Sequence, residues 1–133
     1  MKDLIWDKTL SVEVKEIDED HRKLLELFNS LNHAVEAGDA TNYIEAVLEE
    51  LISFTVAHFR HEERLMLKYD YKNIAEHKTE HQQLIESART LQHQFLQDGK
   101  SLSVEDIEFL ERWLTGHIFG TDMDLGAYLV RVM

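Results

Sequence analysis

The chain has 133 residues, of which 44% are hydrophobic and 30% charged, a composition typical of a globular domain rather than a disordered one. Its 14 basic and 26 acidic residues give a net charge of −12, which argues against nucleic acid as a partner. Neither cysteine nor proline is present, so thiolate metal ligands are excluded and helices are favoured. No apolar run of about 18 residues and no signal-peptide pattern occurs, so we expect a cytoplasmic protein without membrane insertion.

Turn and capping residues divide the chain into an extended arm and a series of helices. Asp18 is a favourable N-cap and Gly38 a favourable C-terminal residue for the first helix. Asp98–Gly99 ends the third helix, and Ser103 with Asp106 forms a weak capping box at the fourth. The predicted segments are an arm over 1–17, helices over about 19–37, 41–69, 74–98 and 104–120, and a short C-terminal helix over about 122–131.

Short connections place successive helices antiparallel to one another. We therefore expect an all-α fold, an up-down-up-down antiparallel four-helix bundle with an extended N-terminal arm. No linker or internal repeat interrupts the pattern, so residues 1–133 are predicted to form a single domain.

Residues spaced alternately by three and four along each helix mark the seam that faces the bundle interior. Most seam residues are apolar, but five histidines and one glutamate also fall on the seams: His21, His58, Glu62, His77, His81 and His117. His33, His61, His93 and Glu63 lie off the seams, and we place them outside the site. The three histidines are interpreted as solvated, with His61 as the exception, because it adjoins Glu62 and lies near the rim of the site. The acidic runs at 16–20 and 48–52 are also interpreted as solvated.

These six seam residues lie near helix termini that meet at one end of an antiparallel bundle. Burying one unpaired polar group costs roughly 1–3 kcal/mol, so five imidazoles and a carboxylate at one level would be destabilising without a ligand. A bound metal removes this conflict, because imidazole nitrogens and carboxylate oxygens become ligands. Five histidines exceed the needs of one tetrahedral zinc, which favours two metal ions.

A second carboxylate near His117 would balance such a site, and the segment HIFGTD supplies Asp122. Five residues of regular helix turn by about 500°, which leaves the two side chains roughly 140° apart. Asp122 therefore reaches the site only if the helix loosens after Gly120 or contains a π-type turn. Asp124 is the competing ligand, although it lies further from His117 along the chain.

These residues resemble the hemerythrin family. The resemblance rests on His21, on HFRHE at 58–62, on EHKTEH at 76–81 and on HIFGTD at 117–122, and it spans essentially the whole chain. Within that family, the chain resembles a single-domain bacteriohemerythrin. One local departure is Asp20, where the family often has an amide; it lies off the seam, so we expect at most an outer-sphere or surface effect.

The resemblance implies a non-haem di-iron site with an oxo or hydroxo bridge between two iron ions. The implied ligands are His77, His81 and His117 for one iron, His21 and His58 for the other, and Glu62 and Asp122 as bridges. The resemblance also implies an oxygen pocket, lined by Leu24, Phe59, Trp113, Leu114 and Ile118.

The implied function is reversible binding of dioxygen, for carriage, storage or delivery, by a binding protein rather than an enzyme. We expect a monomer whose partners are dioxygen and an unidentified oxygen-consuming recipient. A second candidate function is that of a di-iron oxidase or peroxidase, but carboxylate-rich di-iron sites use Glu-x-x-His pairs, and this sequence contains none. A third candidate function is oxygen or redox sensing, or the handling of iron.

Overall fold

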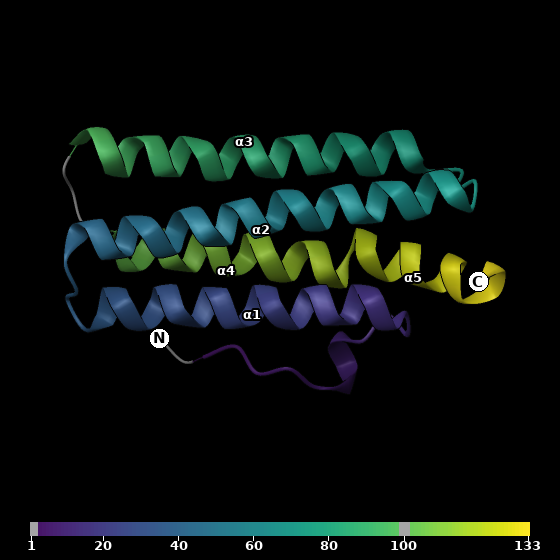
Figure 1. The fold of residues 1–133 in the computed structure, drawn as a ribbon, viewed down its shortest axis with the longest axis horizontal. Helices are drawn as coiled ribbons and strands as arrows, with labels where there is room; N and C mark the ends of the chain where they lie inside the picture. Colours follow the sequence, from purple (N-terminus) through teal and green to yellow (C-terminus); the bar gives the residue numbers. More distant parts are fainter. Residues whose placement is uncertain (1–2, 99–101) are drawn as a thin grey trace.

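The computed structural model describes residues 3–98 and 102–133, and the regular elements within them are all helical. In chain order they are the 3₁₀ helix η1 (Lys8–Leu10) and the α-helices α1 (Lys15–Glu36), α2 (Thr41–Lys68), α3 (Ile74–Asp98), α4 (Val104–Phe119) and α5 (Thr121–Val132). Helices α1 to α4 lie side by side in alternating directions (Figure 1). The predicted all-α, up-down-up-down bundle is confirmed. Gly99, predicted to end the third helix, lies outside the described residues.

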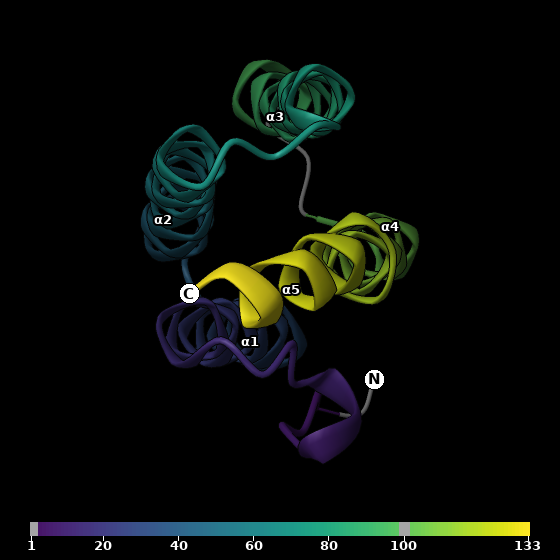
Figure 2. The same ribbon diagram turned by 90° about the vertical axis from the view of Figure 1, so that its right-hand side faces the viewer.

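The end view places α1 to α4 at the four corners of the bundle (Figure 2). Helix α5 leaves α4 and crosses the end of the bundle beside α1, and the N-terminal arm follows the outside of α1 (Figures 1 and 2). Helices α1 and α3 begin at this end, and α2 and α4 terminate there. Polar seam residues near these four termini are therefore brought to a single level.

The first helix begins at Lys15, earlier than the start predicted at about residue 19. Asp18, predicted as its N-cap, instead lies inside the first turn. Its carboxylate accepts hydrogen bonds from the Ser11 hydroxyl (2.6 Å) and from the Val12 backbone N–H (2.9 Å). An acidic residue is favourable at a helix N-terminus, but this one binds the arm rather than capping the helix. Because the arm also contains η1, it is not extended throughout.

The predicted capping signals at two other helix termini are confirmed. Gly38 follows α1 with a φ of +67°, a conformation that glycine adopts without steric cost, and its N–H donates to the Val35 carbonyl at 3.1 Å. At the start of α4, the Ser103 side chain accepts from the Asp106 N–H, and the Asp106 side chain accepts from the Ser103 N–H.

Two groups of buried apolar side chains fill the bundle. The larger group lies among helices α1 to α4 along most of their length, and its most deeply buried members include Phe28, Leu31, Leu48, Leu51 and Leu110. The smaller group joins the arm and α5 to the end of the bundle, and consists of Val12, Val14, Ile17, Leu65, Met66, Tyr71, Leu125 and Leu129. Within the described residues, no helix is long and apolar enough to cross a membrane.

The arm packs directly on α5 at Gly126. A Cβ atom added to this glycine would lie 2.6 Å from the Val12 Cβ and 2.7 Å from the Val12 carbonyl oxygen. Only a residue without a side chain allows this close approach. The contact holds the arm against the helix that also contains Asp122.

Candidate metal centre

The structure brings all seven predicted ligands into one buried cluster at the end of the bundle crossed by α5. None of their side chains is more than about 3% exposed. The cluster consists of His21 from α1, His58 and Glu62 from α2, His77 and His81 from α3, His117 from α4 and Asp122 from α5. Residues separated by up to 101 positions in the chain are thus in direct contact.

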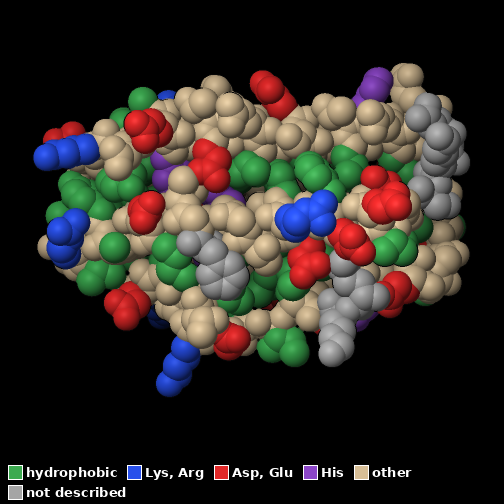
Figure 3. Space-filling view, turned by 180° about the vertical axis from the view of Figure 1, so that it is seen from behind, with side chains coloured by type: hydrophobic (Ala, Val, Ile, Leu, Met, Phe, Trp, Pro, Cys, Tyr) green, Lys and Arg blue, Asp and Glu red, His purple; other side chains and the backbone are tan. Residues whose placement is uncertain are grey.

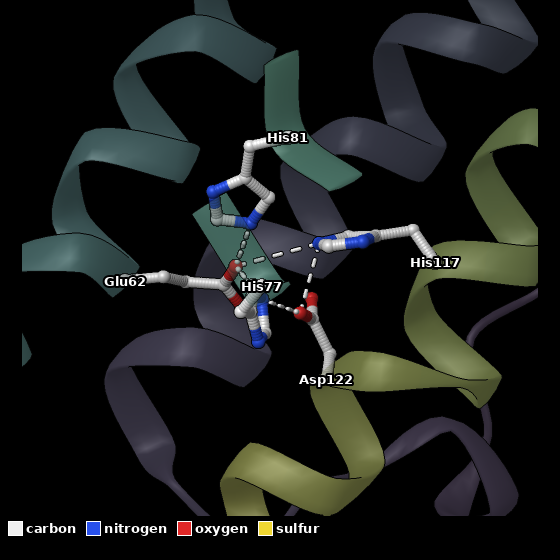
Figure 4. Close-up of side chains that lie close together, drawn as sticks. All are labelled: Glu62, His77, His81, His117 and Asp122. Carbon is white, nitrogen blue, oxygen red and sulfur yellow. Dashed lines mark hydrogen bonds and ion pairs between the residues drawn. The ribbon is translucent and has the colours of Figure 1, made fainter. Parts of the chain in front are cut away.

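All five imidazoles turn the Nε2 atom toward Glu62 or Asp122, as Figure 4 shows for three of them. The shortest distances from Nε2 to a carboxylate oxygen are 2.6 Å for His21, 3.4 Å for His58, 3.2 Å for His77, 2.9 Å for His81 and 2.8 Å for His117. The same nitrogen of every ring therefore points to the centre of the cluster.

The two carboxylates divide their oxygens between two sets of histidines. Glu62 Oε1 and Asp122 Oδ1 face the three-histidine set, which consists of His77, His81 and His117. Glu62 Oε2 and Asp122 Oδ2 face the two-histidine set, which consists of His21 and His58. Each carboxylate thus presents one oxygen to each set, which is the arrangement of a carboxylate that bridges two cations.

The donor atoms fit a pair of transition-metal ions. The ligand atoms of each histidine set, together with both carboxylates, lie within 4.8 Å of one another. Among the described residues, three buried side-chain atoms make no hydrogen bond of good geometry: His21 Nδ1, Glu62 Oε2 and Asp122 Oδ1. The two oxygens do lie near imidazole nitrogens, Asp122 Oδ1 at 2.8 Å from His117 Nε2 and Glu62 Oε2 at 3.4 Å from His58 Nε2. An unsatisfied buried polar atom costs about 1–3 kcal/mol, and a cation would satisfy the two oxygens. Imidazole nitrogens and carboxylate oxygens together suit iron.

A break in the helix at Gly120 turns Asp122 into the cluster. Helix α4 ends at Phe119, Gly120 has φ −95° and ψ −102°, and α5 begins at the next residue. A Cβ on Gly120 would lie 2.8 Å from the Gly116 carbonyl oxygen, so the break requires glycine. The loosening predicted after Gly120 is therefore present. Asp124, the competing ligand, is exposed and lies outside the cluster.

The charges of the two carboxylates shift the pKa values of the buried imidazoles. Burial by itself lowers a histidine pKa, but the charge of Glu62 and a hydrogen bond to Asp122 raise the pKa of His58 well above its ordinary value. Against the same effect of burial, hydrogen bonds to Asp122 and Glu62 raise the pKa of His77 to about 9. The charge of Asp122 raises the pKa of His117 in the same way. Despite burial, the imidazoles hold the pKa values of both carboxyl groups well below their usual range.

The outer ring nitrogens of two histidines donate to carboxylates on neighbouring helices. His58 Nδ1–H donates to Asp20 Oδ2 at 2.9 Å, and His81 Nδ1–H donates to Glu63 Oε2 at 2.9 Å. Such partners orient an imidazole and increase its basicity as a metal ligand. Burial raises the pKa of the Asp20 carboxyl, but the hydrogen bonds from His58 and His61 outweigh this effect and lower it.

The outer nitrogen of His117 also has polar neighbours. Its Nδ1 lies 3.1 Å from the Thr121 hydroxyl oxygen and 3.6 Å from Glu80 Oε1. The Glu80 side chain is 29% exposed, and the pKa of its carboxyl is lowered chiefly by its hydrogen bond with His117. Three of the five rings in the cluster therefore have an outer partner.

Two residues that were placed outside the site, His61 and Glu63, belong to this outer layer. That interpretation was wrong for Glu63, whereas His61 lies at the rim of the site, as its exception anticipated. His61 is only 22% exposed in its side chain, and its Nδ1–H donates to Asp20 Oδ2 at 2.7 Å. Glu63 is 26% exposed and binds His81. The acidic run at 16–20 is likewise not simply solvated, because Asp18 binds the arm and Asp20 binds two histidines. For Asp20 we expected at most an outer-sphere or surface effect, and its contact with His58 is an outer-sphere contact of this kind.

Sequence adjacency was the available signal for these outer partners. Each is the chain neighbour of a cluster residue but contacts a different histidine: Asp20 precedes His21, Glu63 follows Glu62, Glu80 precedes His81, and Thr121 precedes Asp122. A neighbour in the helix is rotated by about 100° from the seam, which places it on the flank that meets the next helix. Which imidazole it meets depends on how the helices pack.

A cavity of about 10 Å³ lies beside His117, lined also by Leu24, Thr55, Phe59, Leu84, Trp113 and Leu114. Four of the five residues implied for the oxygen pocket are in this wall, whereas Ile118 is buried in the apolar core. Thr55 and Leu84 were not assigned to the pocket from the sequence. The Thr55 hydroxyl donates to the Leu51 carbonyl at 2.7 Å, and the Trp113 indole N–H donates to the Leu84 carbonyl at 2.8 Å.

The cavity is lined by residues from all four long helices, α3 and α4 among them. On the face seen from behind, hydrophobic side chains follow the boundary between α3 and α4, and histidine atoms are visible toward the α5 end (Figure 3). Larger surface hollows lie elsewhere, such as the one between Glu13 and Met133, and none of the seven cluster residues lines them. The small cavity beside the cluster is therefore bounded mainly by apolar side chains.

Fold and cluster together define a metal-binding four-helix bundle with histidine and carboxylate ligands. The family model described as the hemerythrin HHE cation binding domain matches residues 12–129. The chain belongs to the hemerythrin family.

Named relatives and solved structures agree with this membership. The chain is 33% identical over 118 residues to a hemerythrin-like protein of Naegleria gruberi, covering 89% of this chain and 87% of that protein. It is 33% identical over 119 residues to a bacteriohemerythrin of Stenotrophomonas maltophilia, covering 90% and 76%. A wild-type hemerythrin crystal structure superposes with a TM-score of 0.87 at 28% identity, covering 95% of this chain and 97% of that one.

Proposed function

We propose that the chain binds two iron ions in this cluster and binds dioxygen reversibly beside them. The observation that carries the proposal is the division of carboxylate oxygens, since Glu62 and Asp122 each present one oxygen to each histidine set. The three-histidine set would hold one iron and the two-histidine set the other, with both carboxylates as bridges. Bound iron would supply the electrons for reversible binding of dioxygen.

The two ligand sets are unequal, which supports a binding site at one ion. Five side chains converge on the first position and four on the second, counting the shared carboxylates in both. The second position therefore leaves more room for an added ligand. Leu24 and Thr55, each one helical turn from a member of the two-histidine set, line the small cavity.

The cavity supports binding rather than turnover of an organic substrate. A volume of about 10 Å³ is close to the minimum that holds one water molecule, so it favours a very small ligand. The Thr55 hydroxyl is bonded to the backbone, and no carboxylate of the described residues lines the wall. A non-enzymatic oxygen-binding protein agrees with these features better than an oxidase or peroxidase. The sensing and iron-handling roles, the monomeric state, the recipient and the cytoplasmic location stay predictions.

The proposal is tested by iron analysis combined with visible spectra of the reduced protein under argon, after air, and again under vacuum. We expect iron at both positions and an absorption band that appears with oxygen and disappears on its removal. Zinc without colour, or one metal per chain, would overturn the di-iron assignment. Irreversible bleaching with release of hydrogen peroxide would support an oxidase instead.

The bridging role of Asp122 has a matched control two residues away. Replacing Asp122 by alanine should lower the iron content, because its oxygens face both histidine sets. Replacing the exposed Asp124 by alanine removes the same charge from the same helix and should leave the iron content unchanged. Loss of iron from Asp124→Ala but not from Asp122→Ala would mean that Asp122 is not the bridging carboxylate.

A further inference from the structure

Asp20 is shared between a cluster histidine and a histidine outside the cluster. Its Oδ2 atom accepts from His58 Nδ1–H at 2.9 Å and from His61 Nδ1–H at 2.7 Å. The side chain of His58 is fully buried, whereas those of Asp20 and His61 are 21% and 22% exposed. The three residues connect α1 to α2 at the level of the metal centre.

The orientation of the two-histidine set depends on the single hydrogen bond between His58 and Asp20, whereas two rings of the three-histidine set have outer contacts. His21 Nδ1 has no hydrogen-bond partner among the described residues, so His58 is the member of this set whose ring is held from outside. In the three-histidine set, by contrast, His81 is held by Glu63, and His117 lies beside Thr121. The position with fewer ligands thus has fewer outer contacts as well.

His61 restricts the orientation of Asp20. A carboxylate that is about one-fifth exposed can rotate toward water unless a second donor fixes it, and an exposed ion pair contributes little by itself. Here both donors are on α2, three residues apart, and they face the same carboxylate oxygen from α1. His61 Nε2 lies 3.2 Å from Glu16 Oε2, which fixes the far side of the imidazole.

We propose that His61 is a positioning residue for the metal centre: it fixes Asp20, and Asp20 fixes the His58 ring with Nε2 toward the iron of the two-histidine set. The inference rests on the proposed di-iron function. Its consequence is selective, because His61 affects retention of one iron and not of the other.

The test is the rate of iron loss from fully loaded, reduced protein to a ferrous chelator under argon, with two phases expected in the wild type. Asp20→Asn should accelerate one phase by roughly 10- to 100-fold, the usual effect of losing an outer-sphere partner. Glu63→Gln should accelerate the other phase, which assigns the phases to the two positions. His61→Leu should accelerate the Asp20-dependent phase by several-fold.

Two further variants separate positioning from a general structural effect. His61→Asn retains an N–H donor near the position of Nδ1 and should restore the wild-type rate. His93→Leu makes the same histidine-to-leucine change at an exposed position on α3, and it should change the rate of neither phase. Circular dichroism and melting of each variant verify that the bundle is intact.

Three results would overturn the inference while leaving the di-iron site in place. These are wild-type rates in His61→Leu, equal acceleration of both phases, and release from His61→Asn as fast as from His61→Leu. A wild-type chain that binds fewer than two irons would overturn the proposed function, and this inference with it.

Discussion

The two halves of the bundle are built on the same helical seams but filled with opposite chemistry. In the half next to the α1–α2 connection, seam positions hold Phe28, Leu31 and Leu48, all fully buried. In the half crossed by α5, the seam of every long helix also carries a histidine, and these polar residues are buried almost as completely. Depth of burial therefore does not distinguish the halves; the chemistry of the buried atoms does.

The difference shows how stability and function are divided along the bundle. Apolar burial contributes about 25 cal/mol per Å² of surface removed from water, so burial in the apolar half is favourable without any ligand. The polar half places charges and poorly hydrogen-bonded oxygens in the interior, which is unfavourable until a cation binds them. We infer that the apolar half and the arm hold the ligands in place, and that metal binding contributes further stability.

The largest effect should come from Glu62→Ala in the polar half. Because Glu62 faces both histidine sets, its loss should weaken iron binding at both positions by more than the roughly 10- to 100-fold typical of outer-sphere changes. Iron content after gel filtration measures this. Glu50→Ala removes an exposed acid from the same helix and serves as the control. Full iron content in Glu62→Ala would contradict the shared role of this carboxylate.

Leu51→Ala is the matching change in the apolar half. Leu51 is about 1% exposed, so the cavity created should lower the free energy of unfolding by about 2–5 kcal/mol. The loss should be similar with and without iron, and the iron content should not change. Denaturant titrations of both forms measure it. Loss of iron from Leu51→Ala would show that packing in the apolar half also controls iron binding in the polar half.

The pH dependence of metal-free stability should be a property of the polar half. The pKa of His77 rises from 6.5 in the unfolded chain to about 9 in the fold, so its stabilising contribution is present below pH 6.5 and is lost as pH rises through about 9. His58 and His117 shift in the same direction. Thermal unfolding of iron-free protein should therefore occur at lower temperature at alkaline pH, as circular dichroism measures.

Two controls sharpen this pH prediction. The profile should be flatter in Glu62→Ala, because one of the two central carboxylates that raise these pKa values is missing. It should keep its shape in Leu51→Ala, because that change lies in the apolar half. A wild-type protein whose metal-free stability increased between pH 6.5 and 9 would contradict the sign of the shifts.

The smallest effects concern two glycines. Gly126→Ala places a Cβ 2.6 Å from Val12 Cβ, which should displace the arm from α5 and cost about 1–3 kcal/mol of stability. Gly116→Ala meets no atom within 4 Å and lies inside α4, so it should stabilise the protein by up to about 1 kcal/mol. Thermal melting measures both; equal effects would mean that the arm is not held by close packing.

Much of the fold and of the candidate site follows from helical periodicity. A seam is defined by spacings of three and four, so it identified His58 and Glu62 as interior residues without knowledge of any neighbour. Helix directions then placed the polar residues of four helices at one end. Periodicity could not decide on Asp122, because a regular helix directs it away from His117; the break at Gly120 directs it inward.

The sequence by itself determined the bundle, the interior histidines and the need for a ligand, because these depend on residue spacing and on the cost of burying polar atoms. Only the tertiary structure decided that Asp18 binds the arm, that Glu63 holds His81, and that His61 shares Asp20 with His58. Off-seam residues have no preferred partner in their own helix. Their role is set by the flank of the neighbouring helix, which depends on how the helices pack against one another.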